Sequence, residues 1–280
     1  MSEERTPTPR SGEKSYVIGT HDAEIDRLGV QHRVWRPRVL EFWRESGITE
    51  GMTVIDAGCG PGHATLDLAE IVGRQGRVIA LERSRRFLDA LEANAHARGL
   101  ANIETIETDL ADVDWASLSA DLVWCRWVLA FVPAPAAIVH GMTRALKPGG
   151  AALFHEYYDY ASWRLAPQSP AFEDYVAKVI ARWRASGGEP DIALALPALL
   201  HDAGLRIDSI RPHVFAARMN DFASRWPMGF ARGYLPTMIA TGDLTPAQGA
   251  AIARLLDTTE ADPDALVLTP GVLHIRAVKS

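Results

Sequence analysis

The sequence has only two cysteines, Cys59 and Cys125, among its 280 residues. Two cysteines are too few for the disulfide framework of a small secreted domain, and they lack the C-x-x-C spacing of zinc and redox sites. We therefore expect both to be reduced, small, buried side chains. The H-E-x-x-H pattern is also missing and the histidines are scattered along the chain, so the sequence predicts no metal centre.

Long apolar runs and an excess of positive charge are missing as well. No run approaches the ~20 apolar residues of a membrane span, and the polar start of the chain lacks the apolar core of a signal peptide. The formal net charge of -6 would not attract a nucleic acid. We expect a cytoplasmic globular protein with a flexible tail over residues 1–14, a small-molecule ligand, and neither membrane nor nucleic-acid partners. The sequence leaves a homodimer open.

Short apolar runs alternate with helical patterns from Met52 onward, which is typical of a parallel sheet covered by crossover helices. Five runs predict the first strands: Thr53–Asp56, Arg77–Glu82, Ile103–Glu107, Ala120–Cys125 and Ala151–His155. Two later runs, Arg206–Phe215 and Val272–Val278, predict the last strands. We therefore expect an α/β fold with a Rossmann-like, doubly wound, seven-stranded sheet.

The regular alternation stops after the fifth predicted strand. We expect residues 15–47 to form an N-terminal helical cap and residues 48–157 with 194–280 to form the sheet domain. Helical spacing predicts that two segments within this domain, residues 158–193 and 218–265, form helical lid insertions. Such insertions would lie over the carboxyl edge of the sheet, where open α/β sheets bind ligands.

A glycine-rich loop, Asp56-Ala57-Gly58-Cys59-Gly60-Pro61-Gly62, follows the first predicted strand. The dinucleotide fingerprint G-x-G-x-x-G would need a third glycine where this chain has His63. The spacing found here, D-x-G-x-G-x-G, instead lets the backbone pass close under a ligand. It disfavours a nicotinamide-dependent oxidoreductase, which stays as an alternative.

This loop resembles the first motif of class I S-adenosylmethionine-dependent methyltransferases, and residues 51–157 as a whole are similar to the small-molecule members of that class, such as the ubiquinone and menaquinone biosynthesis group. The resemblance implies S-adenosylmethionine as the cofactor. It places Glu82 at the ribose hydroxyls, Asp109 at the adenine amino group with Leu110 against the ring, and Arg126 along the methionyl tail. The complete set of predicted cofactor-binding residues is Tyr16, Asp56, Ala57, Gly58, Cys59, Gly60, Gly62, Glu82, Arg83, Asp109, Leu110 and Arg126.

Each of these residues also has a structural interpretation. Glu82 alone is consistent with a helix-capping acid, Asp109 with a loop acid, and Arg126 with pairing to a neighbouring carboxylate. Tyr16 is equally consistent with packing of the N-terminal segment, which includes Gln31, onto the core. A protein that binds S-adenosylmethionine without methylating is a further alternative.

The acceptor is less defined by the sequence. Cys125-Arg126-Trp127-Val128 lacks the Asn/Asp-Pro-Pro-aromatic signature of amino methyltransferases that act on DNA bases and glutamine, and a Pro-Cys nucleophile is also missing. These absences favour a small-molecule acceptor in a partly apolar pocket. Candidate pocket residues are Trp127, Phe131, Tyr157, Trp163 and Trp226. If the acceptor is a hydroxyl or a protonated amine, His155 is the predicted general base, with a packed structural histidine as the alternative; His63, directly after the glycine loop, is a second candidate.

Overall fold

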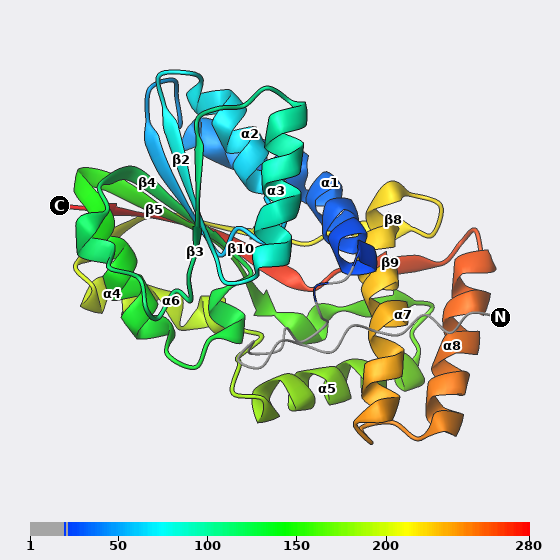
Figure 1. Cartoon of the computed structure of the whole chain (residues 1–280). Coiled ribbons are helices and arrows are strands. Elements are labelled where there is room, and N and C mark those ends of the chain that lie inside the picture. Colours follow the sequence, from blue (N-terminus) through cyan, green and yellow to red (C-terminus); the bar gives the residue numbers. More distant parts are fainter. Residues whose placement is uncertain (1–19, 21) are drawn as a thin grey trace.

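The computed structural model describes residue 20 and residues 22–280 (Figure 1). Tyr16 and the tail predicted over residues 1–14 lie outside the described residues. The larger sheet has seven strands in the order β3-β2-β1-β4-β5-β10-β7. Its strands are β1 Thr53–Ala57, β2 Arg77–Glu82, β3 Ile103–Glu107, β4 Ala120–Arg126, β5 Leu146–Asp159, β7 Leu205–His213 and β10 Gly271–Lys279. The doubly wound, seven-stranded prediction is confirmed.

The order of the strands explains where a ligand can bind. Strand β1 pairs in parallel with both β2 and β4, so the chain winds outward in both directions from the centre. The carboxyl ends of β1, β2 and β4 therefore meet at one edge, and the crevice of a doubly wound sheet lies outside that edge. In the larger sheet, β10 runs antiparallel to both of its neighbours, β5 and β7.

Helices cover both faces of this sheet (Figure 1). On one side α1 Asp22–Glu45 contacts α2 His63–Val72, which in turn contacts α3 Arg85–Ala97. On the other side α4 Pro135–Ala145 contacts α6 Leu196–Asp202. Helix α3 begins after Ser84, whose hydroxyl accepts a hydrogen bond from the Phe87 backbone N–H as its N-cap.

A second group of elements, which we call the lobe, is inserted after β5 and after β7. It consists of β6 Arg164–Ala166, α5 Pro170–Ala185, β8 Ala216–Arg218, α7 Arg225–Ala240, α8 Pro246–Ala261 and β9 Leu266–Leu268. Its three strands form a separate sheet in the order β6-β9-β8. The sequence predicted helical insertions but not this small sheet, because strands of three residues carry too little alternation to be recognised.

Helix α1 joins the lobe to the sheet, since it contacts α7 as well as α2 (Figure 1). Its Trp35 and Trp43 side chains are fully buried. Trp35 packs edge-on against Trp226 of α7, with ring centroids 5.2 Å apart. Burial of large apolar side chains such as these stabilises the fold by ~1.5–3 kcal/mol each. The helix is therefore fixed on the core, and any residue on its cavity side is held firmly.

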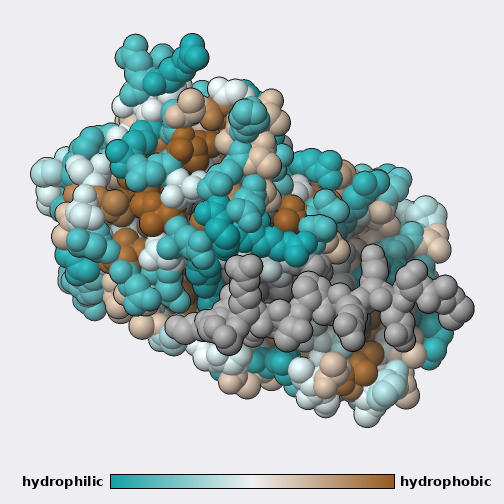
Figure 2. Space-filling model, in the orientation of Figure 1, coloured by the Kyte–Doolittle hydropathy of each residue, from teal (hydrophilic) through white to brown (hydrophobic). Residues whose placement is uncertain are grey.

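The face seen in Figure 2 is mostly hydrophilic, with apolar side chains gathered in small patches. The large apolar side chains that are exposed, among them Phe131, Leu194 and Phe222, come from separate elements. Within the described part of the chain, no helix combines the length and apolarity needed to cross a bilayer.

Candidate active site

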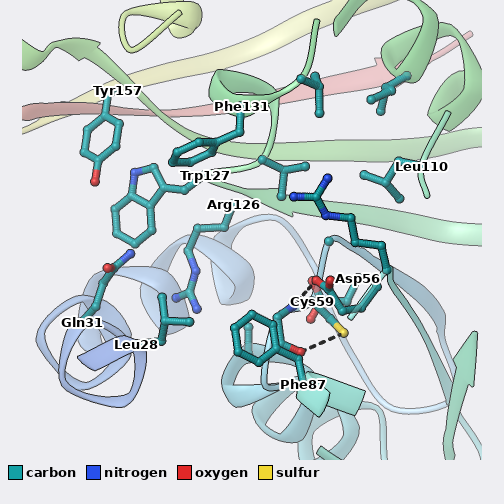
Figure 3. A pocket seen from close by; sticks show the side chains of 18 of the residues that line it. Leu28, Gln31, Asp56, Cys59, Phe87, Leu110, Arg126, Trp127, Phe131 and Tyr157 are labelled. Atoms are coloured by element: carbon teal, nitrogen blue, oxygen red, sulfur yellow. Dashed lines mark hydrogen bonds between the residues drawn. The ribbon is translucent and has the colours of Figure 1, made fainter. Parts of the chain in front are cut away.

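A cavity of about 830 Å³ lies between the carboxyl edge of the larger sheet, helix α1 and the lobe (Figure 3). It has two parts. The cofactor half is lined by Asp56, Gly58, Cys59, Gly60, Pro61, Glu82, Arg83, Asp109, Leu110 and Arg126. The aromatic half is lined by Trp127, Phe131, Tyr157, Tyr160, Trp163, Trp183, Trp226, Phe230 and Tyr234. In Figure 3, Arg126 stands between Trp127 with Tyr157 on one side and Asp56 with Cys59 on the other.

The backbone of the glycine loop favours glycine at three positions. Gly58, Gly60 and Gly62 all have left-handed backbone angles, with φ of 72°, 55° and 80°. A Cβ on Gly58 would lie 2.5 Å from Val128 Cγ2, and one on Gly62 would lie 2.3 Å from Leu91 Cδ1. A Cβ on Gly60 would have no atom within 4 Å, so this side of the loop faces open space. The loop therefore leaves room for a ligand at Gly60 while it packs tightly on either side.

Not every predicted residue of the loop reaches the cavity. Ala57 is fully buried at the end of β1, and Gly62 is the residue before α2; neither lines the cavity. Arg83, directly after β2, does line it. Cys59 and Cys125 are both buried and unbonded, and burial raises the pKa of both thiols well above its ordinary value. The expectation of two small, buried, unpaired cysteines is confirmed.

Glu82 has a structural role as well as a position in the cavity. Its Oε2 accepts a hydrogen bond from the Gly60 N–H (3.0 Å), and its Oε1 accepts one from the Ser84 N–H (2.9 Å). The carboxylate thus ties the glycine loop to the end of β2 and is only 3% exposed. Each carboxylate oxygen can accept a second hydrogen bond, so anchoring of the loop and binding of a ligand hydroxyl are compatible.

Two other acids lie in the cofactor half. Asp56 accepts a hydrogen bond from the Thr65 hydroxyl at 2.7 Å, and burial raises its pKa to about 6. Asp109 follows β3, where its Oδ1 accepts a hydrogen bond from the Ala111 N–H at 3.1 Å. Leu110 beside it is almost fully buried but still lines the cavity. The ends of β1, β2 and β3 thus bring their acids to a single cavity, as the sequence predicted.

Arg126 at the end of β4 is half-buried and makes no ion pair with any described carboxylate. Its Nη1 lies 3.3 Å from His32 Nδ1 of α1. Burial lowers its pKa to about 10, although the charge of Asp56 acts in the opposite direction. The alternative in which Arg126 pairs with a neighbouring carboxylate is therefore not found among the described residues.

The wall of the aromatic half is built on a strained turn. Trp127 has φ of 51°, which is unusual for a residue with a side chain. The turn is held by buried Glu156, whose Oε1 accepts hydrogen bonds from the Val128 N–H (2.9 Å) and the Leu129 N–H (3.0 Å). Trp127 then stacks on Tyr157 and Trp226, with ring centroids 5.4 Å and 5.6 Å away.

His155 does not lie in the cavity, so its assignment as the general base is corrected. Its side chain is fully buried behind Trp127 and Trp35, and its Nδ1 lies 2.8 Å from His274 Nε2. Burial lowers its pKa well below the ordinary value. His155 and Tyr157 project from the same face of β5, but His155 lies further from the strand end and the Trp127 side chain separates it from the cavity.

All five aromatic residues proposed from the sequence line the cavity. Sequence reasoning missed Tyr160, directly after β5, and the lobe residues Trp183, Phe230 and Tyr234, because their positions depend on how the lobe packs. Arg27 and Gln31 of α1 also line the cavity, and the Arg27 Nη1 donates to Gln31 Oε1 at 2.9 Å. Within the described residues no group of three or more acidic, histidine or cysteine side chains is placed to hold a metal ion.

Known proteins resemble this chain in its first part. Residues 48–183 match the family model described as a methyltransferase domain. A demethylmenaquinone methyltransferase from Staphylococcus aureus is 31% identical over 120 residues, which is 43% of this chain and 48% of that protein. The chain spans about half the length of the curated relatives it matches.

Solved structures resemble the whole fold at low identity. The YcgJ protein from Bacillus subtilis has a TM-score of 0.56 at 16% identity, over 84% of this chain and 95% of that chain. The cyclase SpnF has a TM-score of 0.52 at 19% identity, over 82% of this chain and 76% of that chain. Identities this low establish a common fold and leave the reaction to be argued from the site.

Proposed function

We propose that this chain, which carries a class I S-adenosylmethionine-dependent methyltransferase domain, transfers a methyl group to a small acceptor whose reactive part is flat and largely apolar. The observation that carries the proposal is the division of one cavity into a polar half at the sheet edge and an aromatic half under the lobe. A polar cofactor and an apolar acceptor would meet where the halves join, at Arg126 and Trp127 (Figure 3).

The cofactor half fits S-adenosylmethionine. The open side of Gly60 admits a ligand close to the backbone, and the Glu82 carboxylate beside it has acceptor sites for the ribose hydroxyls. Asp109 would accept from the adenine amino group, with Leu110 against the ring. The Arg126 guanidinium, which lacks a described carboxylate partner, suits the carboxylate of the methionyl tail. When bound, the cofactor supplies an electrophilic methyl group on its sulfonium.

The aromatic half supports a flat acceptor. Trp127, Tyr157 and Trp226 stack with interplanar angles of 25°, 27° and 3°, so they form a wall of nearly parallel rings. Parallel aromatic faces favour offset stacking with another ring. The name of the curated relatives refers to a quinone compound, which is also a flat ring.

The polar groups of the aromatic half are mostly donors or are already paired. Arg27 forms a two-point ion pair with Glu24, and Arg182 pairs with Asp243. The Tyr157 hydroxyl and the Gln31 amide point toward the same region in Figure 3. His155 lies outside the cavity, and although His63 lines it, burial lowers the pKa of His63 to about 4, which makes it a weak base. We therefore propose that the nucleophilic atom of the acceptor loses its proton to water, without the help of an enzyme base. Positioning then provides the acceleration, an effect worth up to ~7–11 kcal/mol.

Turnover tests this function directly. The protein is incubated with S-adenosylmethionine and a panel of acceptors, and S-adenosylhomocysteine is quantified. We expect production with flat phenolic, quinol or enolisable ring compounds and none with small polar amines, and we expect Trp226→Ala to lower the rate for the ring compounds. Production with the amines alone would contradict the proposed acceptor class.

Binding without turnover is the main competing outcome, because a cyclase shares this fold. Calorimetry with S-adenosylmethionine and a thermal-shift comparison with a nicotinamide dinucleotide separate the alternatives. Only a true ligand raises the melting temperature by mass action. A rise with the nicotinamide cofactor alone would refute the cofactor assignment.

A further inference from the structure

A chain of hydrogen-bonding side chains leads from the cavity into the contact between α1 and α2. Arg126 Nη1 lies 3.3 Å from His32 Nδ1, and His32 Nε2 lies 3.2 Å from Asp67 Oδ2. The same Asp67 oxygen accepts a hydrogen bond from Arg36 Nε at 2.7 Å. The side chains of His32 and Asp67 are 8% and 6% exposed, so solvent does not supply their partners.

Only one form of His32 satisfies both of its neighbours. A guanidinium has donors and no acceptor, so Nδ1 must accept from Arg126, whereas the Asp67 carboxylate needs a donor, so Nε2 must carry the proton. The neutral Nε2–H tautomer therefore fits. Its pKa supports this form: burial lowers the pKa of His32, and the bond to Asp67 offsets this only in part. Burial acts to raise the pKa of Asp67, but the hydrogen bonds from His32 and Arg36 leave this pKa below its ordinary value.

The chain orients a charged group that projects into the cavity. Arg126 lines the cavity, and His32 is its hydrogen-bonding partner among the described residues. The other guanidinium N–H groups have no described acceptor. A flexible arginine that is already held in one orientation loses less freedom when it binds an anion. The fixed fork suits a carboxylate, which it can bind through two parallel hydrogen bonds.

We propose that His32 is a positioning residue, oriented by Asp67, that holds the Arg126 guanidinium ready to bind a carboxylate in the cavity. The proposal rests on the proposed function, in which the methionyl carboxylate of the cofactor occupies this place. A carboxylate on the acceptor is the second source of the same chemistry. His32 touches neither reactant; it acts through Arg126.

Two substitutions at His32 separate positioning from simple packing. In His32→Asn the amide oxygen takes roughly the place of Nδ1, so an acceptor for Arg126 is kept, while Asp67 loses its hydrogen bond from residue 32 and keeps the one from Arg36. In His32→Gln the longer side chain reaches toward Asp67, and the acceptor for Arg126 is lost. Loss of one charge-assisted hydrogen bond predicts about tenfold weaker binding of S-adenosylmethionine to His32→Gln, and less than about threefold for His32→Asn. Equal losses, or a larger loss in His32→Asn, would overturn the proposal.

A double-mutant cycle keeps the test valid if one variant folds poorly. Arg126→Ala alone is expected to weaken S-adenosylmethionine binding about tenfold or more. In that background His32→Gln should add nothing, because the residue it positions is gone. A further loss of the same size as in the wild-type background would show that His32 acts independently of Arg126. Melting temperatures report the folded state of each variant.

The ligand used in calorimetry identifies the source of the carboxylate. 5′-Methylthioadenosine lacks the amino-acid part of the cofactor, so its affinity should be unchanged in His32→Gln if the methionyl carboxylate is the ligand. If the acceptor supplies the carboxylate, S-adenosylmethionine affinity is unchanged and the KM of the acceptor rises instead. No change in either affinity or KM would refute positioning. Failure of the wild-type protein to bind S-adenosylmethionine would instead refute the proposed function.

The pH profile gives an independent signature. A protonated His32 has no lone pair for Arg126, so the part of the affinity that depends on His32 should be constant above its pKa and should fall as the pH drops through it. Because that pKa is lowered, the fall lies below the ordinary value for histidine. The charged groups facing His32 are Asp67 and Arg36 beside Nε2 and Arg126 beside Nδ1, with the His63 ring stacked at 5.7 Å. His32→Asn should lose the part of the fall that belongs to His32, while titration of Asp56 in the cavity remains. Identical profiles would contradict the proposal.

Discussion

The strained turn that presents Trp127 depends on a buried acid, and its stability should therefore vary with pH. Glu156 is fully buried; its Oε1 accepts from two backbone N–H groups, and its Oε2 has no hydrogen-bond partner within the described part of the chain. Burial raises its pKa from an ordinary value of 4.5 to about 8. The acid is thus mostly protonated in the folded protein at neutral pH, and Glu156→Gln closely imitates that neutral form.

The sign of the effect follows from proton binding. Between the two pKa values the folded protein holds a proton that the unfolded chain has released, so wild-type stability is complete below 4.5 and is lost as the pH rises through about 8. The loss is ~1.4 kcal/mol per pH unit at most, or roughly 4 kcal/mol between about pH 5 and about pH 8. Glutamine does not titrate. We therefore expect Glu156→Gln to match the wild type within about 1 kcal/mol near pH 5 and to be increasingly more stable toward pH 8.

Urea unfolding followed by tryptophan fluorescence, repeated across this pH range, measures the difference. Glu50→Gln, at an exposed glutamate, is the matched control and should show no such trend. Glu156→Leu should be destabilised at every pH, because it leaves the Val128 and Leu129 N–H groups buried without acceptors at ~1–3 kcal/mol each. A difference between Glu156→Gln and the wild type that does not change with pH would refute the reasoning.

Three further predictions concern the cofactor half. Asp109→Ala should weaken S-adenosylmethionine binding by roughly 1–3 kcal/mol, the loss expected when a buried ligand donor is left unpaired; unchanged affinity in calorimetry would remove Asp109 from the site. Glu82→Ala should cost more affinity than Glu82→Gln, because the amide keeps one acceptor oxygen; equal affinities would leave Glu82 only its role as anchor of the glycine loop. Thiol counting without reductant should find Cys59 and Cys125 free after denaturation and slow to react before it, because burial disfavours both thiolates; finding no free thiol would contradict the unbonded state.

The sequence was most informative where the pattern of a strand is followed by an acidic residue at the end of that strand. Apolar runs of five or six residues identified β1, β2 and β3, and the acids after them reached one cavity because parallel strands end at a common edge. The positions of these acids follow from strand periodicity, whereas their expected roles toward a cofactor came from the resemblance to the methyltransferase class.

The remaining residues depend on contacts between distant segments. His155 was assigned to the site because it stands near a strand end, but whether such a side chain reaches the cavity is decided by Trp127, which covers it. The hydrogen bonds of Glu156 to Val128 and of His32 to Arg126 were not predicted, because these partners lie 28 and 94 residues away along the chain. No local pattern encodes such pairs. The small sheet of the lobe and the lobe residues that line the cavity were not predicted for the same reason.

Helix α7 supplies Trp226, Phe230 and Tyr234 to the cavity, four residues apart and hence on one side of a single helix. This helix lies outside residues 48–183, the part that matches the methyltransferase domain. One side of the aromatic half therefore comes from a helix that is separate in the chain from the residues of the cofactor half, while Trp127 and Tyr157 lie within the matched part. Substitutions along one helical stripe should redirect the enzyme to new compounds while the cofactor site keeps its affinity, which makes α7 the natural target for both evolutionary divergence and laboratory redesign.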